Sequence, residues 1–342
     1  MATFVRVQDI EHDIGPDGRL GLRVTSPDVE LRAVKGSTAR VRVEFELRAG
    51  SDAEADTAFE SIQFKVHRAD GVLEVSEPQR NEIGLGAITR MLGISGVKTD
   101  VRVVAEVPTM ATVAYTGVSA DLVGHGTRGP QEYRTVSGDI ALSDVGGSIR
   151  VNGVSGDVAL RAEDAITLHA NTVSGDLSVI APRIDGSRVV TVSGDVELEG
   201  DLGPEDPHRV ETVSGDLSLG IVGGVTLEVR GLSTDVDVNV AHRSEGSRDR
   251  RRYVIGDGAA SVLFSSMSGD VSVGSARRVG GTYRPPTPPT PPTPPTPPTA
   301  PTPPARALPD EAEQLEILQA LERGDIDVET ATRRLAGERT DG

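Results

Sequence analysis

A tripeptide that recurs at nearly constant spacing is the feature that most restricts the fold of this chain. Ser-Gly-Asp occurs six times, always after Val or Met, and degenerate copies lie at 118–121 and 232–235. Successive copies are 18 to 21 residues apart, except for a last interval of 35 residues, which we interpret as two periods with one motif lost. The intact copies are Ser137-Gly138-Asp139, Ser155-Gly156-Asp157, Ser174-Gly175-Asp176, Ser193-Gly194-Asp195, Ser214-Gly215-Asp216 and Ser268-Gly269-Asp270.

The residues around each motif alternate between apolar and polar. Leu142 follows Ile140, and Leu160 follows Val158, at intervals of two positions, which indicates strands with one buried face. Each repeat therefore holds two short strands that flank a Ser-Gly-Asp corner, and such a unit cannot close its own core. Stacking solves this problem, because equivalent strands then pair in parallel about 4.8 Å apart. We predict a mainly β protein with a parallel β-solenoid, or β-helix-like, repeat domain over residues 100–280.

The composition of the corner has two interpretations. In the structural one, Gly adopts backbone angles that are closed to other residues, and Ser and Asp cap neighbouring backbone N–H groups. In the functional one, the six Asp residues form a ladder of Ca²⁺ sites, but the Gly-Gly-x-Gly-x-Asp nonapeptide of calcium-binding β-rolls is missing. We favour the structural corner and predict no metal and no cofactor. Because like charges repel, we expect some of the stacked carboxylates to point to solvent.

Residues 1–99 are expected to start the solenoid and to cap its first coil, whose open edge would otherwise invite aggregation. Alternation over 39–47 indicates a strand, and 64–67 and 72–75 flank a hairpin turn. The segment 52–62 is either a short helix or a loop.

A Gly-interrupted apolar stretch follows at residues 82–98. It is either a segment that plugs the apolar end of the solenoid or a loop that touches a membrane or a partner. We favour the plug, because one covering segment is a usual way to shield such an end.

The C-terminal part of the chain has a different composition. Residues 281–305 are dominated by a Pro-Pro-Thr repeat, so we expect a disordered, extended polyproline linker without helix or sheet. Residues 306–342 show two short helical patterns separated by Gly324. A hairpin of this size is too small to be stable alone, so we expect it to bind another copy of the chain, another protein or a membrane partner. The alternative is a weakly folded tail. The candidate partner-binding residues are Leu315, Leu318, Leu321, Ile326 and Leu335.

The run Thr-Val-Ser-Gly-Asp, as at 135–139 and 172–176, resembles the bacterial "putative adhesin" domain, a family of unknown function. The resemblance covers about residues 4–275 and implies an adhesive solenoid without catalytic residues. Residues 318–326, together with Glu329 and Ala331, resemble the short SHOCT-like helical hairpin. That resemblance implies a role in oligomerisation or docking. Hairpins of this kind accompany putative adhesin domains in some bacterial stress-response proteins.

Composition and motifs exclude several classes of function. A net charge of −17 argues against nucleic-acid binding. The six histidines share no spacing, and the chain has no phosphate-binding loop, nucleophile elbow or His-Glu-x-x-His motif, so we predict no enzymatic activity. Cysteine is absent, which removes disulfides and thiolate metal sites.

We therefore expect a non-enzymatic binding or scaffold protein that displays a rigid solenoid and is tethered to an assembly hairpin. The alternatives are a regulatory protein in bacterial envelope-stress sensing and an exported adhesin. Without a recognisable signal peptide or an apolar run long enough to span a membrane, we expect a cytoplasmic location, with peripheral membrane contact left open.

Overall fold

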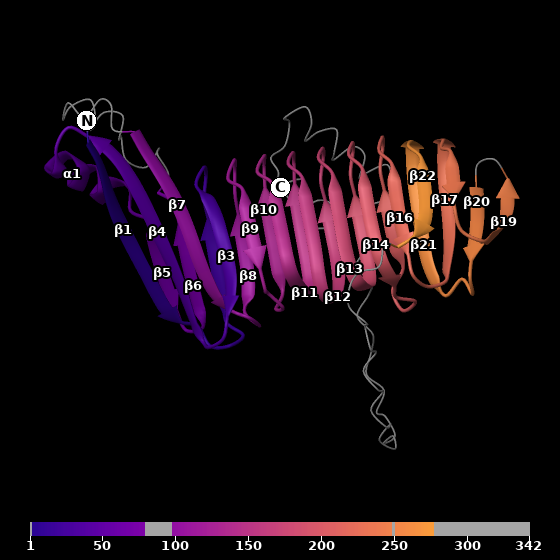
Figure 1. The fold of residues 1–342 in the computed structure, drawn as a ribbon, viewed down its shortest axis with the longest axis horizontal. Helices are drawn as coiled ribbons and strands as arrows, with labels where there is room; N and C mark the ends of the chain where they lie inside the picture. Colours follow the sequence, from indigo (N-terminus) through magenta and orange to yellow (C-terminus); the bar gives the residue numbers. More distant parts are fainter. Residues whose placement is uncertain (1, 79–97, 248–249, 277–342) are drawn as a thin grey trace, which may run out of the picture. The chain divides into compact units, whose positions relative to one another are not determined.

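The computed structural model describes residues 2–78, 98–247 and 250–276 (Figure 1). These residues are mainly β with one helix, so the predicted fold class is confirmed for this part of the chain. The linker at 281–305, the hairpin at 306–342 and nearly all of the apolar stretch at 82–98 lie outside the described residues. The helix is α1 (Asp52–Ile62), and the strands are β1 (Ala2–Asp13), β2 (Arg19–Arg23), β3 (Asp28–Val34), β4 (Thr38–Ala49), β5 (Lys65–Ala69), β6 (Val72–Ser76), β7 (Lys98–Pro108), β8 (Thr112–Thr116), β9 (Leu122–His125), β10 (Gln131–Thr135), β11 (Ile140–Gly153), β12 (Val158–Asn171), β13 (Leu177–Val190), β14 (Val196–Leu202), β15 (His208–Glu211), β16 (Leu217–Ile221), β17 (Val225–Ser233), β18 (Val236–Val238), β19 (His242–Ser247), β20 (Arg250–Ile255), β21 (Ala260–Ser268) and β22 (Val271–Ser275).

The strands form two long sheets that face each other. Strands before a Ser-Gly-Asp corner make up the pre-corner sheet, in the order β5-β6-β2-β8-β10-β11-β12-β13-β15-β21-β17-β20-β19. Strands after a corner make up the post-corner sheet, in the order β1-β4-β7-β3-β9-β11-β12-β13-β14-β16-β22-β18. The long strands β11, β12 and β13 belong to both, because each bends from the post-corner sheet into the pre-corner sheet.

Equivalent apolar residues stack between the two sheets, as the alternation predicts. Leu142 pairs in parallel register with Leu160, and Leu160 pairs with Val179, one coil further along. All three side chains are buried. At 25 cal/mol per Å² of apolar surface, each such side chain contributes about 2 kcal/mol, and the core continues along the stack because every coil supplies the same positions.

The C-terminal coils do not follow chain order, so the interpretation of the 35-residue interval as a coil that lost its motif is wrong. β21 pairs with both β15 and β17, and β22 pairs with both β16 and β18, so the last coil in sequence lies between two earlier ones. The intervening residues form β19 and β20, an antiparallel hairpin that pairs with the other edge of β17.

The N-terminal region supplies a coil of the stack as well as its end. β2 pairs in parallel with β6 and β8, and β3 pairs with β7 and β9, so residues 19–34 lie inside the solenoid. The antiparallel strands β1 and β4 and the hairpin of β5 and β6 follow on the outer side. The segment 52–62 is a helix whose N-cap is Ser51, and Phe59 in this helix packs edge-on against Phe45 of β4.

Candidate functional site

The six Asp residues of the intact corners lie in one file along the solenoid, and each carboxylate binds the next coil. The backbone N–H of Asp157 donates to Oδ1 of Asp139 at 2.8 Å, and the N–H of Asp176 donates to Oδ1 of Asp157 at 2.9 Å. The side chains are exposed to solvent, yet each holds a neighbouring backbone group. The complete Asp file, in spatial order, is Asp28, Asp121, Asp139, Asp157, Asp176, Asp195, Asp216, Asp270 and Asp235.

The Ser and Gly residues of the corners complete this connection. The N–H of Ser155 donates to the carbonyl of Val136 at 2.8 Å, and Ser174, Ser193, Ser214 and Ser268 repeat the contact with the coil before them. Each corner glycine sits close to its neighbour's backbone: an added Cβ would lie 2.0–2.5 Å from a carbonyl oxygen of the adjacent corner, for Gly138, Gly156, Gly175, Gly194, Gly215 and Gly269 alike. Only three of them, Gly156, Gly175 and Gly194, have a positive φ, so close stacking is the requirement that all six share.

Sequence reasoning missed the first member of the file. The segment Thr25-Ser26-Pro27-Asp28 lies where the other coils have Val-Ser-Gly-Asp, because the N–H of Ser119 donates to the carbonyl of Thr25 and the N–H of Asp121 donates to Oδ1 of Asp28. The Ser-x-Asp spacing was a usable signal, but proline stands where the other motifs have glycine.

An acidic groove of about 510 Å³ runs beside the C-terminal half of the file. Small side chains on the outer face of the post-corner sheet, such as Ser178, Ser218 and Ser272, form its floor. Among the residues that the structure describes, none that lines it is basic. Within the described parts of the chain, no group of three or more histidine, aspartate or glutamate side chains is arranged to hold a metal ion. In the groove wall, the carboxylates of Asp176, Asp195, Asp216 and Asp270 each accept a backbone N–H, and Asp237 accepts a hydrogen bond from the side-chain amide of Asn239.

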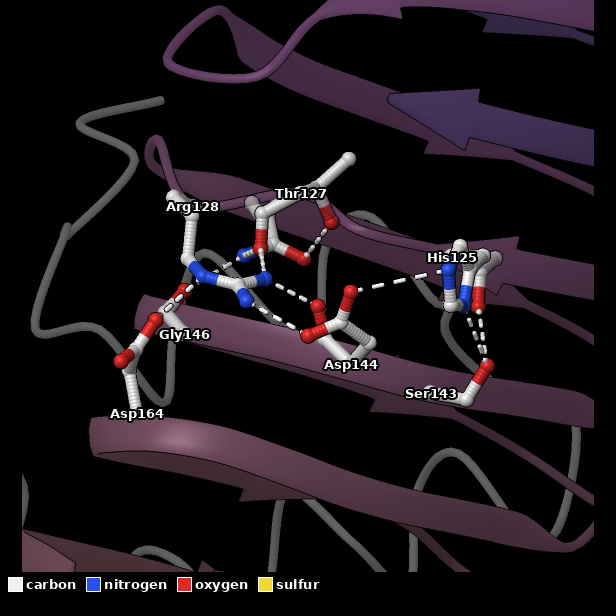
Figure 2. A network of polar contacts seen from close by, with 9 residues as sticks. His125, Thr127, Arg128, Ser143, Asp144, Gly146 and Asp164 are labelled. Carbon is white, nitrogen blue, oxygen red and sulfur yellow. Dashed lines mark hydrogen bonds and ion pairs between the residues drawn. The ribbon is translucent and has the colours of Figure 1, made fainter. Parts of the chain in front are cut away.

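The opposite edge of the solenoid carries a second polar network (Figure 2). Arg128 reaches two coils from one turn: its Nη2 lies 2.6 Å from Oδ1 of Asp144, and its Nε binds Asp164. Gln131, which is buried, donates to the carbonyl of Gly146 at 2.8 Å. Burial opposes the charge of Arg128, but the hydrogen bonds and charges of the two aspartates outweigh it and raise the arginine's pKa. The network fastens three successive turns together.

His125, Ser143 and Asp144 come together in this network, but their geometry differs from that of a hydrolytic triad. His125 Nδ1 lies 3.1 Å from Ser143 Oγ, and His125 Nε2 lies 3.5 Å from Asp144 Oδ2. Asp144 is already paired with Arg128, and Ser143 Oγ also donates to the carbonyl of Gly124 at 3.4 Å. A catalytic serine needs a histidine base that a carboxylate orients. Here the carboxylate of Asp144 is held by Arg128 and lies further from His125.

A second His–Ser pair is fully enclosed. His208 is buried, with Nδ1 3.0 Å from Ser187 Oγ and Nε2 3.0 Å from the carbonyl of Gly203. Burial lowers the pKa of His208, although the Gly203 carbonyl and nearby aspartates act in the other direction. A neutral imidazole between two oxygen partners holds the turn before β15, and its side chain is buried.

The outer face of the pre-corner sheet carries a row of basic residues, although the chain has a net negative charge. Four coils in succession place a basic side chain at equivalent positions, and we call this set the cationic file. Its members pair in register across β11, β12, β13 and β15. Each member lies five positions before the Ser of its corner. This regular spacing is visible in the sequence, but it was not identified in the sequence analysis. The cationic file is Arg150, His169, Arg188 and Arg209.

Further basic residues surround a cavity of about 240 Å³ on the N-terminal part of the same face. Gly21 and Ala114 leave space there because their side chains are small or absent, and the longer side chains of neighbouring residues form the walls. The charged residues that line the cavity are Arg19, Arg23, Lys65, Glu74, Glu132 and Arg134, with His67.

The candidate partner-binding residues Leu315, Leu318, Leu321, Ile326 and Leu335 lie outside the described residues. Within the described part of the chain, no helix is both long enough and apolar enough to cross a membrane.

Comparison with known proteins identifies the family of the chain. No curated protein matches the chain. Solved structures that are similar to this chain include a "putative adhesin" from Bacteroides fragilis (11% identity, TM-score 0.46, 78% of this chain and 97% of that chain covered), a "putative cell adhesion protein" from Clostridium sporogenes (11%, 0.23, 80% and 99%) and a "putative lipid binding protein" from Parabacteroides distasonis (15%, 0.42, 79% and 97%). The profile of the Toastrack DUF4097 family matches residues 20–274, which include the whole Asp file and both sheets apart from β1, and the chain therefore belongs to the Toastrack DUF4097 family.

Proposed function

We propose that this protein is a non-enzymatic binding protein that displays the outer faces of a rigid solenoid to a partner. The observation that carries the proposal is the unbroken Asp file. Because each carboxylate holds the next coil at 2.8–3.2 Å, the outward side chains are kept at the fixed spacing of paired strands. A surface that repeats one chemistry at regular steps suits recognition of an extended partner, whereas catalysis needs different groups converging on one bond.

The polar clusters support the same proposal. The Arg128 network and the buried His208 each have a structural task, since they fasten turns of neighbouring coils. Neither cluster leaves an unpaired base beside an accessible nucleophile.

The C-terminal hairpin is proposed to provide assembly. Leu315, Leu318 and Leu321 share one helical face in the sequence pattern, and a short hairpin gains stability mainly by binding something larger. The partner would be a second copy of the chain or another protein, and the Pro-rich segment would serve as the spacer.

Affinity capture tests the proposal. The intact chain and a version that ends at Arg284 are used as baits, and bound molecules are identified by mass spectrometry. Partners retained by both baits support display by the solenoid. Partners lost with the tail would move recognition to the hairpin and overturn the assignment of binding to the solenoid faces.

Cell fractionation separates the alternatives. Self-associated protein recovered without membranes supports the scaffold. Recovery with membranes that is lost on deletion of 285–342 would favour a regulatory role, and sensitivity of whole cells to added protease would favour an exported adhesin.

A further inference from the structure

We propose that the outer face of the pre-corner sheet binds a linear acidic polysaccharide, whose carboxylate groups are held by the cationic file. This inference rests on the proposed binding function and names the face and the chemical class of the partner. It extends the function by assigning a site to side chains that lie outside the buried core.

The first argument is the charge of the face in its context. The chain carries a net charge of −17, yet Arg150, Arg188 and Arg209 project from three of four successive coils. Among the described residues, no carboxylate forms an ion pair with Arg150 or Arg188, while Arg209 lies 3.9 Å from Glu211. Unpaired arginines in a row are unfavourable for the isolated protein, because like charges repel, and an anionic partner would relieve that repulsion.

The second argument is spacing. Arg150 pairs in register with His169, and His169 pairs with Arg188, so the members of the file recur at strand spacing, about 4.8 Å for each coil. Arginine binds carboxylates through two parallel N–H···O bonds. Burial and the two flanking arginines lower the pKa of His169, so near neutral pH it serves as an uncharged hydrogen-bonding group between two permanent cations. A chain with regularly spaced acidic groups, separated by hydroxyl groups, matches this alternation.

The third argument concerns what lies beside the cationic file. Ser148 and Thr167, paired in register, lie on one side of it, and Asn171 lies on the other. Hydroxyl and amide groups bind sugar hydroxyls through both donors and acceptors.

The same face argues against other polyanions. Single-stranded nucleic acids bind through aromatic side chains on which bases stack, and the described aromatic residues on β8, β10 and β21 point inward. A flat anionic membrane would cover the whole face, including Glu74, Glu132 and Glu211, and would approach the acidic corner edge. A single extended polymer needs only the narrow line of the cationic file, where Glu132 pairs in register with Arg150 at one end and Glu211 lies beside Arg209 at the other.

Fluorescein-labelled polygalacturonate, which carries a carboxylate on every sugar, is the probe, and fluorescence anisotropy on the full-length protein is the measurement. The test variant is Arg150→Gln/Arg188→Gln. The matched control is Arg102→Gln/Arg161→Gln, which removes the same charge from exposed positions on the outer face of the post-corner sheet. Thermal unfolding of both variants verifies that they fold like the unmodified chain.

We expect the test variant to bind polygalacturonate about tenfold more weakly, a loss of about 1.4 kcal/mol, and the control variant to bind like the unmodified chain. Neutral dextran should not compete. Equal weakening in both variants, or no binding by the unmodified protein, overturns the proposal. Tighter binding of oligothymidylate, or of phosphatidylglycerol vesicles, with the same dependence on Arg150 and Arg188, also overturns it in favour of a different polyanion. If partners are captured by both the intact chain and the version that ends at Arg284, while polygalacturonate does not bind, the polysaccharide assignment is wrong and the proposed binding function stands.

Discussion

The backbone N–H of Asp176 donates a 2.9 Å hydrogen bond to Oδ1 of Asp157, a residue that lies one coil away. An aspartate in a turn ordinarily caps N–H groups of its own turn. Here the carboxylate connects two coils, so the repeated Asp holds neighbouring coils together as well as shaping the corner. Because the next coil repeats the contact, the corner edge is hydrogen-bonded along the solenoid through side chains in addition to the parallel ladders of its strands.

Substitution of Asp157 tests this role. Asp157→Ala removes the acceptor for the N–H of Asp176 and should lower the free energy of unfolding by about 1 kcal/mol. Asp157→Asn keeps an oxygen acceptor and removes a charge from a file of like charges, so it should cost less than alanine. Urea denaturation measures both. Equal losses for the two variants would show that the hydrogen bond does not contribute.

Close stacking of the corner glycines leads to a second prediction. A Cβ on Gly175 would lie 2.3 Å from the carbonyl oxygen of Gly156, and the residue has φ of 125°. Gly175→Ala should therefore destabilise the protein by about 2 kcal/mol or more. Gly274, in β22, has open space around its Cβ position, so Gly274→Ala is the control and should be nearly neutral. A similar shift in thermal midpoint for the two variants would contradict the assignment.

Burial of the inward positions can be tested with two valines of the same sheet. Val196 is buried, whereas Val123 is 54% exposed on the outer face. Val196→Asp places an unpaired carboxylate in the core and should cost several kcal/mol. Val123→Asp should change the thermal midpoint little. An unchanged midpoint for Val196→Asp would refute the inward orientation of the residues that follow each corner.

The fold could be predicted from the sequence where the information is local. The Ser-Gly-Asp motif and the alternation around Leu142 define a corner and two half-buried strands, and stacking follows because one coil cannot bury its own apolar face. The order of the coils could not be predicted near the C-terminus. β21 pairs in parallel with both β15 and β17. The alternation of apolar and polar residues is the same in each of these strands, so it does not determine which strand lies beside which.

The candidate binding face was missed for a different reason. A motif is recognised when the same residues recur, whereas Arg150, His169 and Arg188 share only a basic residue type and a position relative to the corner. Their relation becomes visible once the repeats are aligned on the Ser of each motif. Asp28 was not recognised as part of the repeat for a similar reason, because proline precedes it where the other motifs have glycine.

The buried His208 makes stability depend on pH, and the sign follows from its environment. Burial lowers its pKa in the folded protein, while the unfolded chain has the ordinary value of about 6.5. Above that value both states are neutral and the folded protein is most stable. As the pH falls below it, the unfolded chain takes up a proton that the folded protein resists, so stability decreases by at most about 1.4 kcal/mol for each pH unit.

His208→Gln should therefore be less stable than the unmodified chain at pH 7.5 but should lose less stability between pH 7.5 and pH 5.5, because glutamine does not titrate. His169, whose pKa is also lowered by burial and by its two arginine neighbours, should leave part of the dependence in place. His67→Gln, at an exposed position, is the control and should keep the full dependence. The measurement is urea denaturation at both pH values. If His208→Gln and the unmodified chain lose equal free energy over this range, His208 is not the residue that couples protonation to folding.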